Sequence, residues 1–336
     1  MSTKSDENAR YFEYGYIEGV ERLEKYEPGG YHPLLIGDII HDRYKIVNKL
    51  GFGGYSIVWL AHDIRDRQYV AVKVGIAGLA RHEFEVLRDL SSTASSISHP
   101  GRSSIPNILD EFSVEGPNGA HLCYTTAPAR CDLKDVACGR IFSLQVARAL
   151  AARITQALAY VHSRGYVHGD VHIRNILVKA SPELDSLSLE KFYREYGDPD
   201  LTPIERRDGK PLPLNIPSTA VTPICMGRIK ADRFTLADAK VLLSDFGEAF
   251  DPAVHSRQAQ ESHTPLGIRP PEARFEPLGP LSYAGDIWSL GLLIWQIIGL
   301  KSLFTTDFPY PDELISDYID VLRPGVDGFD MPESWW

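Results

Sequence analysis

The spacing of apolar side chains follows two different periods in the first third of the chain. Three short stretches, in which apolar residues alternate with others between tight turns, predict an antiparallel meander. They span residues 44–50, 56–61 and 69–74. A helical period comes next, with one glutamate in its stripe, and its members are Leu79, Glu83, Leu87 and Leu90, with Val86 beside them. Two further strand-like segments, 105–112 and 121–126, complete a region rich in β-structure.

Helical spacing dominates the second half. Between residues 144 and 162 a core-facing apolar stripe recurs every three or four positions. Its members are Leu150, Ile154, Leu158 and Val161. Short apolar strands are predicted at 176–178 and 240–245. A later helix, which begins near Asp286, is apolar on nearly all sides, so we expect it to be buried.

Strand patterns early and helical patterns late favour an α+β fold, and 336 residues suit two lobes better than one core. We assign a leader to residues 1–36, a small antiparallel β N-lobe with one main helix to 37–127, and a mostly helical C-lobe to 128–336. Residues 181–235 are rich in Pro, Asp and Ser, so we expect a loop-rich insert in the C-lobe.

Composition narrows the class of partner. The formal net charge of -10 argues against non-specific nucleic-acid binding and favours a basic partner. The four cysteines show no CxxC spacing, which is typical of a reducing compartment. The most apolar run, residues 288–300, is too short and interrupted to span a bilayer. We expect a soluble monomer with no membrane partner.

A glycine cluster, Gly51-Phe52-Gly53-Gly54-Tyr55-Ser56, lies between the first two predicted strands. Glycines let backbone N–H groups approach phosphate oxygens without obstruction by side chains, so the cluster is a candidate phosphate-binding loop. A plain hairpin turn is the alternative.

Lys73 lies in an apolar strand 22 residues after Gly51. A lysine there is costly unless it is paired, although an exposed edge lysine would also fit. Glu83 is the one charged member of the helical stripe, whereas Glu85 points about 200° away around the helix. We therefore expect Glu83 to pair with Lys73, with a surface ion pair to a neighbouring arginine as the alternative.

Two acidic motifs follow in order. Asp170 and Asn175 are five residues apart in a segment after the long helix, and Asp245 follows a buried strand in Ser244-Asp-Phe-Gly. The Asp170 carboxylate would orient the attacking hydroxyl and accept its proton, while Asn175 and Asp245 would hold Mg²⁺. Each motif alone occurs by chance, but their order after Lys73 and Glu83 argues for phosphoryl transfer.

Over residues 44–300 the chain resembles the eukaryotic protein kinases, most closely the SR-protein kinase branch. The resemblance is carried by the segments 31–38, 43–47, 49–56 and 58–61, by Arg269-Pro-Pro-Glu272, and by Asp286-x-Trp-x-x-Gly. It implies a two-lobed kinase fold, ATP and Mg²⁺ as cofactors, and serine phosphorylation in basic, Arg/Ser-rich proteins. It also implies residence in the cytoplasm and nucleus. The nucleotide would contact the glycine cluster and further residues: Val58, Ala71, Lys73, Thr126, Ala127 and Asn175.

The departures from the family pattern concern the catalytic loop. Gly169 replaces an arginine that reads an activation-loop phosphate in relatives, which predicts no such switch here, or else a relaxed turn. His172 stands in place of a lysine that steadies the γ-phosphate, and Arg174 is a candidate to supply that charge. Relatives continue past a segment like Trp335-Trp336, so we expect missing C-terminal helices, an absent arginine partner for Glu272, and an exposed apolar patch.

Three functions are compatible with these residues. An active serine/threonine protein kinase uses Asp170, Lys73, Glu83, Asn175 and Asp245 together. A pseudokinase or scaffold would bind nucleotide or a partner with little turnover, and His172 favours it. A small-molecule phosphotransferase shares the sequence His-Gly-Asp but lacks Pro-Pro-Glu followed by Asp-x-Trp-x-x-Gly, which this chain has.

Overall fold

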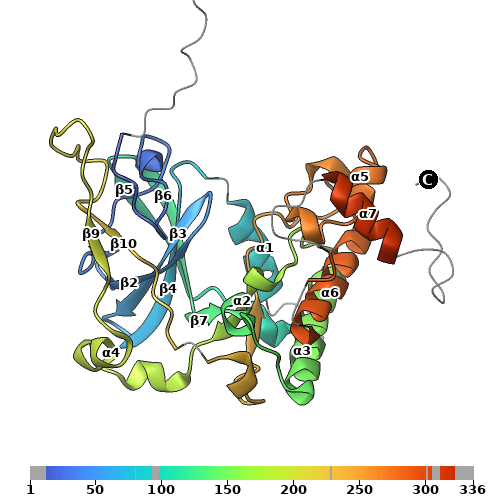
Figure 1. The fold of residues 1–336 in the computed structure, drawn as a ribbon. Helices are drawn as coiled ribbons and strands as arrows, with labels where there is room; N and C mark the ends of the chain where they lie inside the picture. Colours follow the sequence, from blue (N-terminus) through green and yellow to red (C-terminus); the bar gives the residue numbers. More distant parts are fainter. Residues whose placement is uncertain are drawn as a thin grey trace, which may run out of the picture. The chain divides into compact units, whose positions relative to one another are not determined.

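A computed structural model describes residues 13–79, 81–92, 98–227, 229–299, 302–304 and 311–321 (Figure 1). The chain forms two compact units. The first comprises residues 1–81, 108–128 and 180–226, and the second comprises residues 82–107, 129–179 and 227–336. Trp335 and Trp336 lie outside the described residues.

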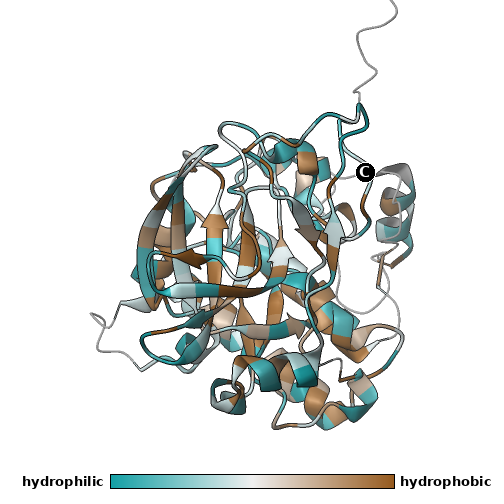
Figure 2. Cartoon of the chain, turned by 90° about the vertical axis from the view of Figure 1, so that its left-hand side faces the viewer, coloured by the Kyte–Doolittle hydropathy of each residue, from teal (hydrophilic) through white to brown (hydrophobic). Residues whose placement is uncertain are grey.

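The first unit is built on a six-stranded antiparallel sheet with the order β1-β2-β3-β4-β6-β5. Its strands are β1 (Ile39–Ile40), β2 (Tyr44–Phe52), β3 (Ser56–Asp63), β4 (Gln68–Gly75), β5 (Asp110–Gly116) and β6 (Gly119–Thr126). The predicted meander is present as β2 to β4. Much of the sheet is apolar, brown in Figure 2, because β-branched and aromatic side chains pack on both of its faces. The fifth strand starts five residues later than position 105, where we expected it.

The segment 180–226 differs from our expectation. We expected a loop-rich insert in the C-lobe, but the structure places these residues in the first unit and gives them regular elements. These are η4 (Pro182–Ser186), α4 (Leu189–Tyr196) and the antiparallel pair β9 (Leu201–Pro203) and β10 (Thr219–Val221). Phe192 of α4 is fully buried and stacks on Tyr69 of β4. The helix could have been predicted, because Leu189, Phe192, Tyr193 and Tyr196 recur at helical spacing. That it packs on the sheet of the first unit is shown only by the structure.

The leader is also part of the first core rather than an extended arm. Its buried side chains pack with those of the insert and the sheet, and they are Tyr14, Leu23, Tyr26, Tyr31 and Leu34. Inside that core the Lys49 ammonium of β2 lies 2.6 Å from the Glu21 carboxylate of the leader, with each side chain 1% exposed. The Tyr26 hydroxyl donates to the same carboxylate over 2.6 Å. The leader is thus fastened to the sheet by a buried charge pair.

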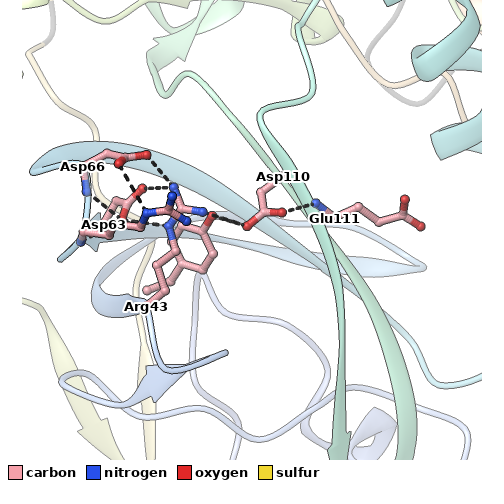
Figure 3. A network of polar contacts seen from close by, with 7 residues as sticks. Arg43, Asp63, Asp66, Asp110 and Glu111 are labelled. Carbon is pink, nitrogen blue, oxygen red and sulfur yellow. Dashed lines mark hydrogen bonds and ion pairs between the residues drawn. The ribbon is translucent and has the colours of Figure 1, made fainter.

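A second charge network in this unit is centred on Arg43, which directly precedes β2 (Figure 3). The Arg43 guanidinium bonds to Asp63, Asp66 and Asp110 over 2.6–3.1 Å. Burial alone would raise the pKa of Asp63, but Arg43 and two backbone N–H groups reverse the shift and lower it. The Tyr44 hydroxyl donates to Asp110 over 2.6 Å. Arg43 therefore links the β3–β4 turn to β5.

The second unit is mainly helical. Its α-helices are α1 (His82–Ser91), α2 (Leu133–Ala137), α3 (Leu144–Ser163), α5 (Glu272–Phe275), α6 (Tyr283–Ile298) and α7 (Pro311–Val321). Short 3-10 helices are η2 (Pro100–Ser104), η3 (Ile173–Asn175), η5 (Ala231–Arg233), η6 (Ala259–Glu261) and η7 (Leu266–Ile268). A three-stranded sheet has the order β11-β8-β7, with β7 (Ala129–Asp132), β8 (Ile176–Lys179) and β11 (Val241–Leu243).

The two long helices of this unit, α3 and α6, can be compared with the burial that their apolar spacing predicted. The predicted stripe of α3 is buried throughout, and Ser143 caps its first turn through a bond from Val146 N. The expectation that α6 is buried on nearly all sides is wrong, because Ile287, Trp295 and Ile298 are 44–55% exposed. No helix in the described ranges is long and apolar enough to cross a membrane.

Candidate active site

The glycine cluster forms the turn between β2 and β3 in the first unit. Gly53 N donates to Ser56 O over 2.9 Å and closes the turn. A Cβ built on Gly51, Gly53 or Gly54 would meet no atom within 4 Å, and none of the three has a positive φ. The fold itself therefore does not require glycine here. What the glycines preserve is open space above the backbone, which suits the approach of a phosphate group.

Four candidate nucleotide-binding residues share one face of the sheet. Lys73 pairs with Val58 on β3, and Ala71 pairs with Thr126 at the end of β6. Directly paired residues point to the same face, and so do residues two apart on one strand, so Val58, Ala71, Lys73 and Thr126 line up together. The Lys73 ammonium lies 6.0 Å from the centre of the Tyr124 ring.

Glu83 is on α1 in the second unit, where it is half-buried. The helix begins at His82, so Leu79 lies before it, and the expected stripe is wrong at that position. The buried face is made by Phe84, Val86, Leu87 and Leu90 instead. Since Lys73 and Glu83 belong to different compact units, their pairing stays a prediction.

One buried carboxylate accepts hydrogen bonds from the backbone of the catalytic loop. Asp286, in the first turn of α6, is 3% exposed. It accepts bonds from His168 N over 2.7 Å, from Gly169 N over 2.9 Å, and from the ring of His162 over 2.8 Å. Asp286 therefore fixes the loop backbone to the start of α6. His162 was missed, because nothing in its sequence context distinguishes it from the apolar stripe of α3.

His168 links this loop to the strand that precedes Asp245. Its Nδ1 accepts a bond from Asp170 N over 3.3 Å, which leaves the proton on Nε2, 3.2 Å from Ser244 O. The ring also packs against Phe246, with 4.8 Å between ring centres. His168 was part of the sequence motif but had no assigned role, and the structure gives it one in positioning.

Asp170 has an arrangement suited to a reacting group. Its Oδ2 accepts a bond from Asn175 Nδ2 over 3.1 Å and lies 3.3 Å from His172 Nε2. Its Oδ1 is buried and has no partner among the described residues. Burial alone would raise the pKa of Asp170, but His172 and Asn175 outweigh it and the pKa is lowered. The carboxylate is thus ionised at neutral pH, with one oxygen left to receive a proton.

His172 and Arg174 flank this group differently. His172 Nδ1 accepts a bond from Arg174 N over 3.2 Å, so the ring presents its Nε2–H to Asp170. The Arg174 side chain is exposed. Burial raises the pKa of Asp132, and Arg174 opposes that shift, which places its charge near Asp132. The ring of His172, rather than Arg174, is the group in contact with Asp170.

Asn175 and Asp245 lie at the same end of the β8–β11 ladder. Ile176 pairs with Leu243, and Ser244 N donates to Asn175 O over 2.9 Å. Asn175 Nδ2 is committed to Asp170, so its Oδ1 is the atom that remains for a metal. Asp245 has a φ of 64°, an uncommon value for a residue with a side chain.

This donor set fits a magnesium ion held jointly with a substrate. Nowhere in the described ranges do three or more His, Cys, Asp or Glu side chains gather as a metal site. A carboxylate and an amide oxygen are too few to hold Mg²⁺ alone, but Mg²⁺ is commonly bound by one or two protein oxygens, water and phosphate. Asn175 and Asp245 match that pattern.

Gly169 makes close contact with the segment after Asp245. Its φ is 78°, and a Cβ there would lie 2.8 Å from Glu248 O. Arg257 and His263 bond to the two Glu248 carboxylate oxygens over 2.7 and 2.8 Å. Thr264 donates to Gly169 O over 2.9 Å. The backbone therefore requires glycine here, and Glu248, which belongs to none of the sequence motifs, makes close contact with it.

Burial raises the pKa of Glu272, which follows Pro270 and Pro271. Within the described ranges no basic side chain forms an ion pair with it. The expectation that its usual arginine partner is absent stays a prediction.

Comparison with known proteins shows which family the chain resembles. The family model for the protein kinase domain matches residues 44–188. A serine/threonine protein kinase of Aspergillus fumigatus is 29% identical over 316 residues, which cover 90% of this chain and 71% of that protein. The chain is similar to protein kinases over most of its length. Its relatives are named as serine/threonine kinases, and the predicted enzyme class is confirmed.

Two further relatives of this kinase belong to the branch predicted from its sequence. The serine/threonine-protein kinase spk-1 of Caenorhabditis elegans is 35% identical over 175 residues, 49% of this chain and 17% of that protein. The human SRSF protein kinase 3 is 34% identical over 170 residues, 48% of this chain and 30% of that protein.

A crystal structure of another kinase domain matches with a TM-score of 0.55 at 18% identity, covering 86% of this chain and 78% of the other. At that identity the match speaks for the fold alone, and it confirms the protein-kinase fold predicted from the sequence.

Proposed function

We propose that this kinase depends on ATP and Mg²⁺ and transfers the γ-phosphate of ATP to serine or threonine hydroxyls of a protein substrate. The observation that carries the proposal is the environment of Asp170. An ionised, buried carboxylate has one oxygen held by Asn175 and His172 and the other without a protein partner. That is the arrangement needed to orient a hydroxyl and take up its proton.

The other groups have supporting roles in this proposal. Asn175 Oδ1 and Asp245 hold Mg²⁺, which when bound supplies charge neutralisation to the phosphates. Lys73, with Glu83 as its predicted partner, holds the α- and β-phosphates, and the loop 51–56 covers them. Val58, Ala71, Thr126 and Ala127 line the adenine site. His172 donates to Asp170, and Arg174 adds positive charge where the substrate approaches.

The substrate class is proposed as basic, Arg/Ser-rich protein. The net charge of -10 supports a cationic partner, and a relative is named as an SRSF protein kinase. We further propose that the kinase acts as a monomer in cytoplasm and nucleus, without a nucleic-acid or membrane partner. A scaffold without turnover finds no support among the relatives, since those named above are all kinases.

The test is a phosphoryl-transfer assay with radiolabelled ATP and three matched peptides. One peptide is Arg/Ser-rich, the second has alanine for every serine, and the third has glutamate for every arginine. We expect label in the first peptide alone, and none after chelation of Mg²⁺. Small alcohols are tested alongside the peptides. Thermal stabilisation by Mg-ATP with no transfer to any peptide or alcohol would favour the scaffold and overturn the proposal.

A further inference from the structure

Two residues of the leader hold the glycine loop by its carbonyl oxygens. The Tyr31 hydroxyl donates to Gly53 O over 2.6 Å, and Lys25 Nζ donates to Gly54 O over 2.8 Å. The next carbonyl, that of Tyr55, accepts a bond from Ile76 N over 2.9 Å. Three consecutive carbonyls of the loop are therefore occupied, two of them by side chains 22 and 29 residues upstream.

These donors are themselves fixed. Tyr31 is 3% exposed, and its backbone is held on both sides, by a bond from Tyr31 N to Lys25 O and by one from Asn118 Nδ2 to Tyr31 O. The turn between Lys25 and Tyr31 requires glycine at position 30, where a Cβ would lie 1.9 Å from Lys25 O. Gly30 O also accepts a bond from Ala77 N just after β4. The leader turn is thus a rigid part of the unit that carries the loop.

The orientation of the carbonyls determines that of the amides. In a trans peptide the C=O and N–H groups point in opposite directions. Since the carbonyls of Gly53 and Gly54 point at the leader, the N–H groups of Gly54 and Tyr55 point away from it. Within the described ranges neither amide donates to a protein acceptor. Two adjacent N–H groups directed to one side form an anion-binding concavity.

We propose that Lys25 and Tyr31 are positioning residues that hold the loop 51–56 with its amide N–H groups turned toward the nucleotide phosphates. The proposal rests on the proposed function, because it assumes that the loop binds a nucleotide. The cost of ordering a glycine-rich loop is then met during folding instead of at each binding event, which raises affinity for the phosphates.

The test compares Tyr31→Phe and Lys25→Met with two matched controls. Tyr26→Phe removes another buried hydroxyl of the leader, one that bonds to Glu21 and not to the loop. Lys25→Arg keeps a donor within reach of Gly54 O. Calorimetry of the full chain measures the affinity for Mg-ADP and for adenosine, which lacks phosphates.

We expect Tyr31→Phe and Lys25→Met each to weaken Mg-ADP binding by about 3- to 10-fold, the equivalent of one hydrogen bond, and to leave adenosine binding unchanged. Lys25→Arg should bind as the wild type does, and Tyr26→Phe should lower thermal stability without changing either affinity. Equal losses for Mg-ADP and adenosine, or no loss in either variant, would overturn the positioning role.

Hydrogen exchange in the nucleotide-free protein separates this proposal from the proposed function. Tyr31→Phe should speed amide exchange at Gly53 and Ile76, whose N–H groups bond to Ser56 O and Tyr55 O in and beside the loop, whether or not the protein turns over ATP. The wild-type protein could bind no nucleotide while Tyr31→Phe still speeds this exchange. That result would overturn the proposed function and leave the positioning role of Tyr31 intact. Unchanged exchange in Tyr31→Phe would overturn the positioning role itself.

Discussion

The buried pair of Glu21 and Lys49 provides the sharpest test of how the leader is attached. Glu21→Gln keeps the size of the side chain and removes its charge. The Lys49 ammonium then loses the carboxylate 2.6 Å away while both side chains stay 1% exposed. Breaking a buried ion pair by removing one partner costs about 3–5 kcal/mol, because an uncompensated charge remains in the core.

That cost is large beside a typical unfolding free energy of about 5–15 kcal/mol. Urea lowers the unfolding free energy by about 1–3 kcal/mol per molar, so the midpoint for the first unit should fall by at least about 1 M. Tryptophan fluorescence is a suitable probe, because Trp59 is buried and its ring lies 5.0 Å from the Lys49 ammonium. Glu24→Gln, in the same leader but half-exposed, is the control and should leave the midpoint unchanged.

The pH dependence of the same variant has a definite sign. Burial lowers the pKa of Lys49 below its ordinary value, and Glu21 opposes that shift. Without Glu21 the folded pKa falls further. Between the folded and unfolded pKa values the unfolded chain binds more protons, so the unfolding free energy rises with pH across that window. We expect Glu21→Gln to recover part of its lost stability as the pH is raised from neutral, over a wider window than the wild type.

Removing both charges should cost far less than removing one. The combination of Glu21→Leu, Lys49→Met and Tyr26→Phe leaves no buried charge and no hydroxyl without its acceptor, so its stability should return close to that of the wild type. The reasoning is refuted if Glu21→Gln unfolds at the wild-type urea concentration, since the leader would then not be part of the core.

Three other predictions follow from single groups. Asp170→Asn should lower kcat by about 10²-fold or more while the affinity for Mg-ADP, measured by calorimetry, changes little; an equal loss in both would show that Asp170 acts in binding. Gly169→Ala should destabilise the protein by about 1–3 kcal/mol in urea unfolding, because its φ of 78° and the Glu248 carbonyl both disfavour a Cβ, and an unchanged midpoint would contradict the structure. Burial lowers the pKa of His32 to about 4, so between about pH 6.5 and pH 4 the unfolded chain binds a proton at this histidine that the folded protein does not bind. The unfolding free energy should therefore fall by at most about 3 kcal/mol as the pH is lowered through this interval. His32→Gln should lose less stability over that interval, and an identical acid profile would exclude His32 as the cause.

Sequence patterns alone predict the local features of this protein. The period of α3 follows from four apolar residues spaced by three or four positions, and the meander β2–β4 follows from alternation between short turns. The order of the motifs pointed to the kinase family, because phosphoryl transfer requires these residue types and their spacing is kept along the chain. The same local reasoning identified Asp170 and Asn175, which are five residues apart and in contact.

Features that depend on residues far apart in the chain are visible only in the folded protein. The segment 180–226 belongs to the first unit, and Lys49 bonds to Glu21, 28 residues before it. Both findings concern apolar and charged groups that become neighbours only after the sheet has formed. Gly169 shows the same limit. Its sequence position marked a missing arginine, but the reason for glycine is the carbonyl of Glu248, which lies 79 positions later and within 2.8 Å of any Cβ. The spacing of residues predicts whether a segment forms a helix or a strand. It does not predict against which distant segment that element packs.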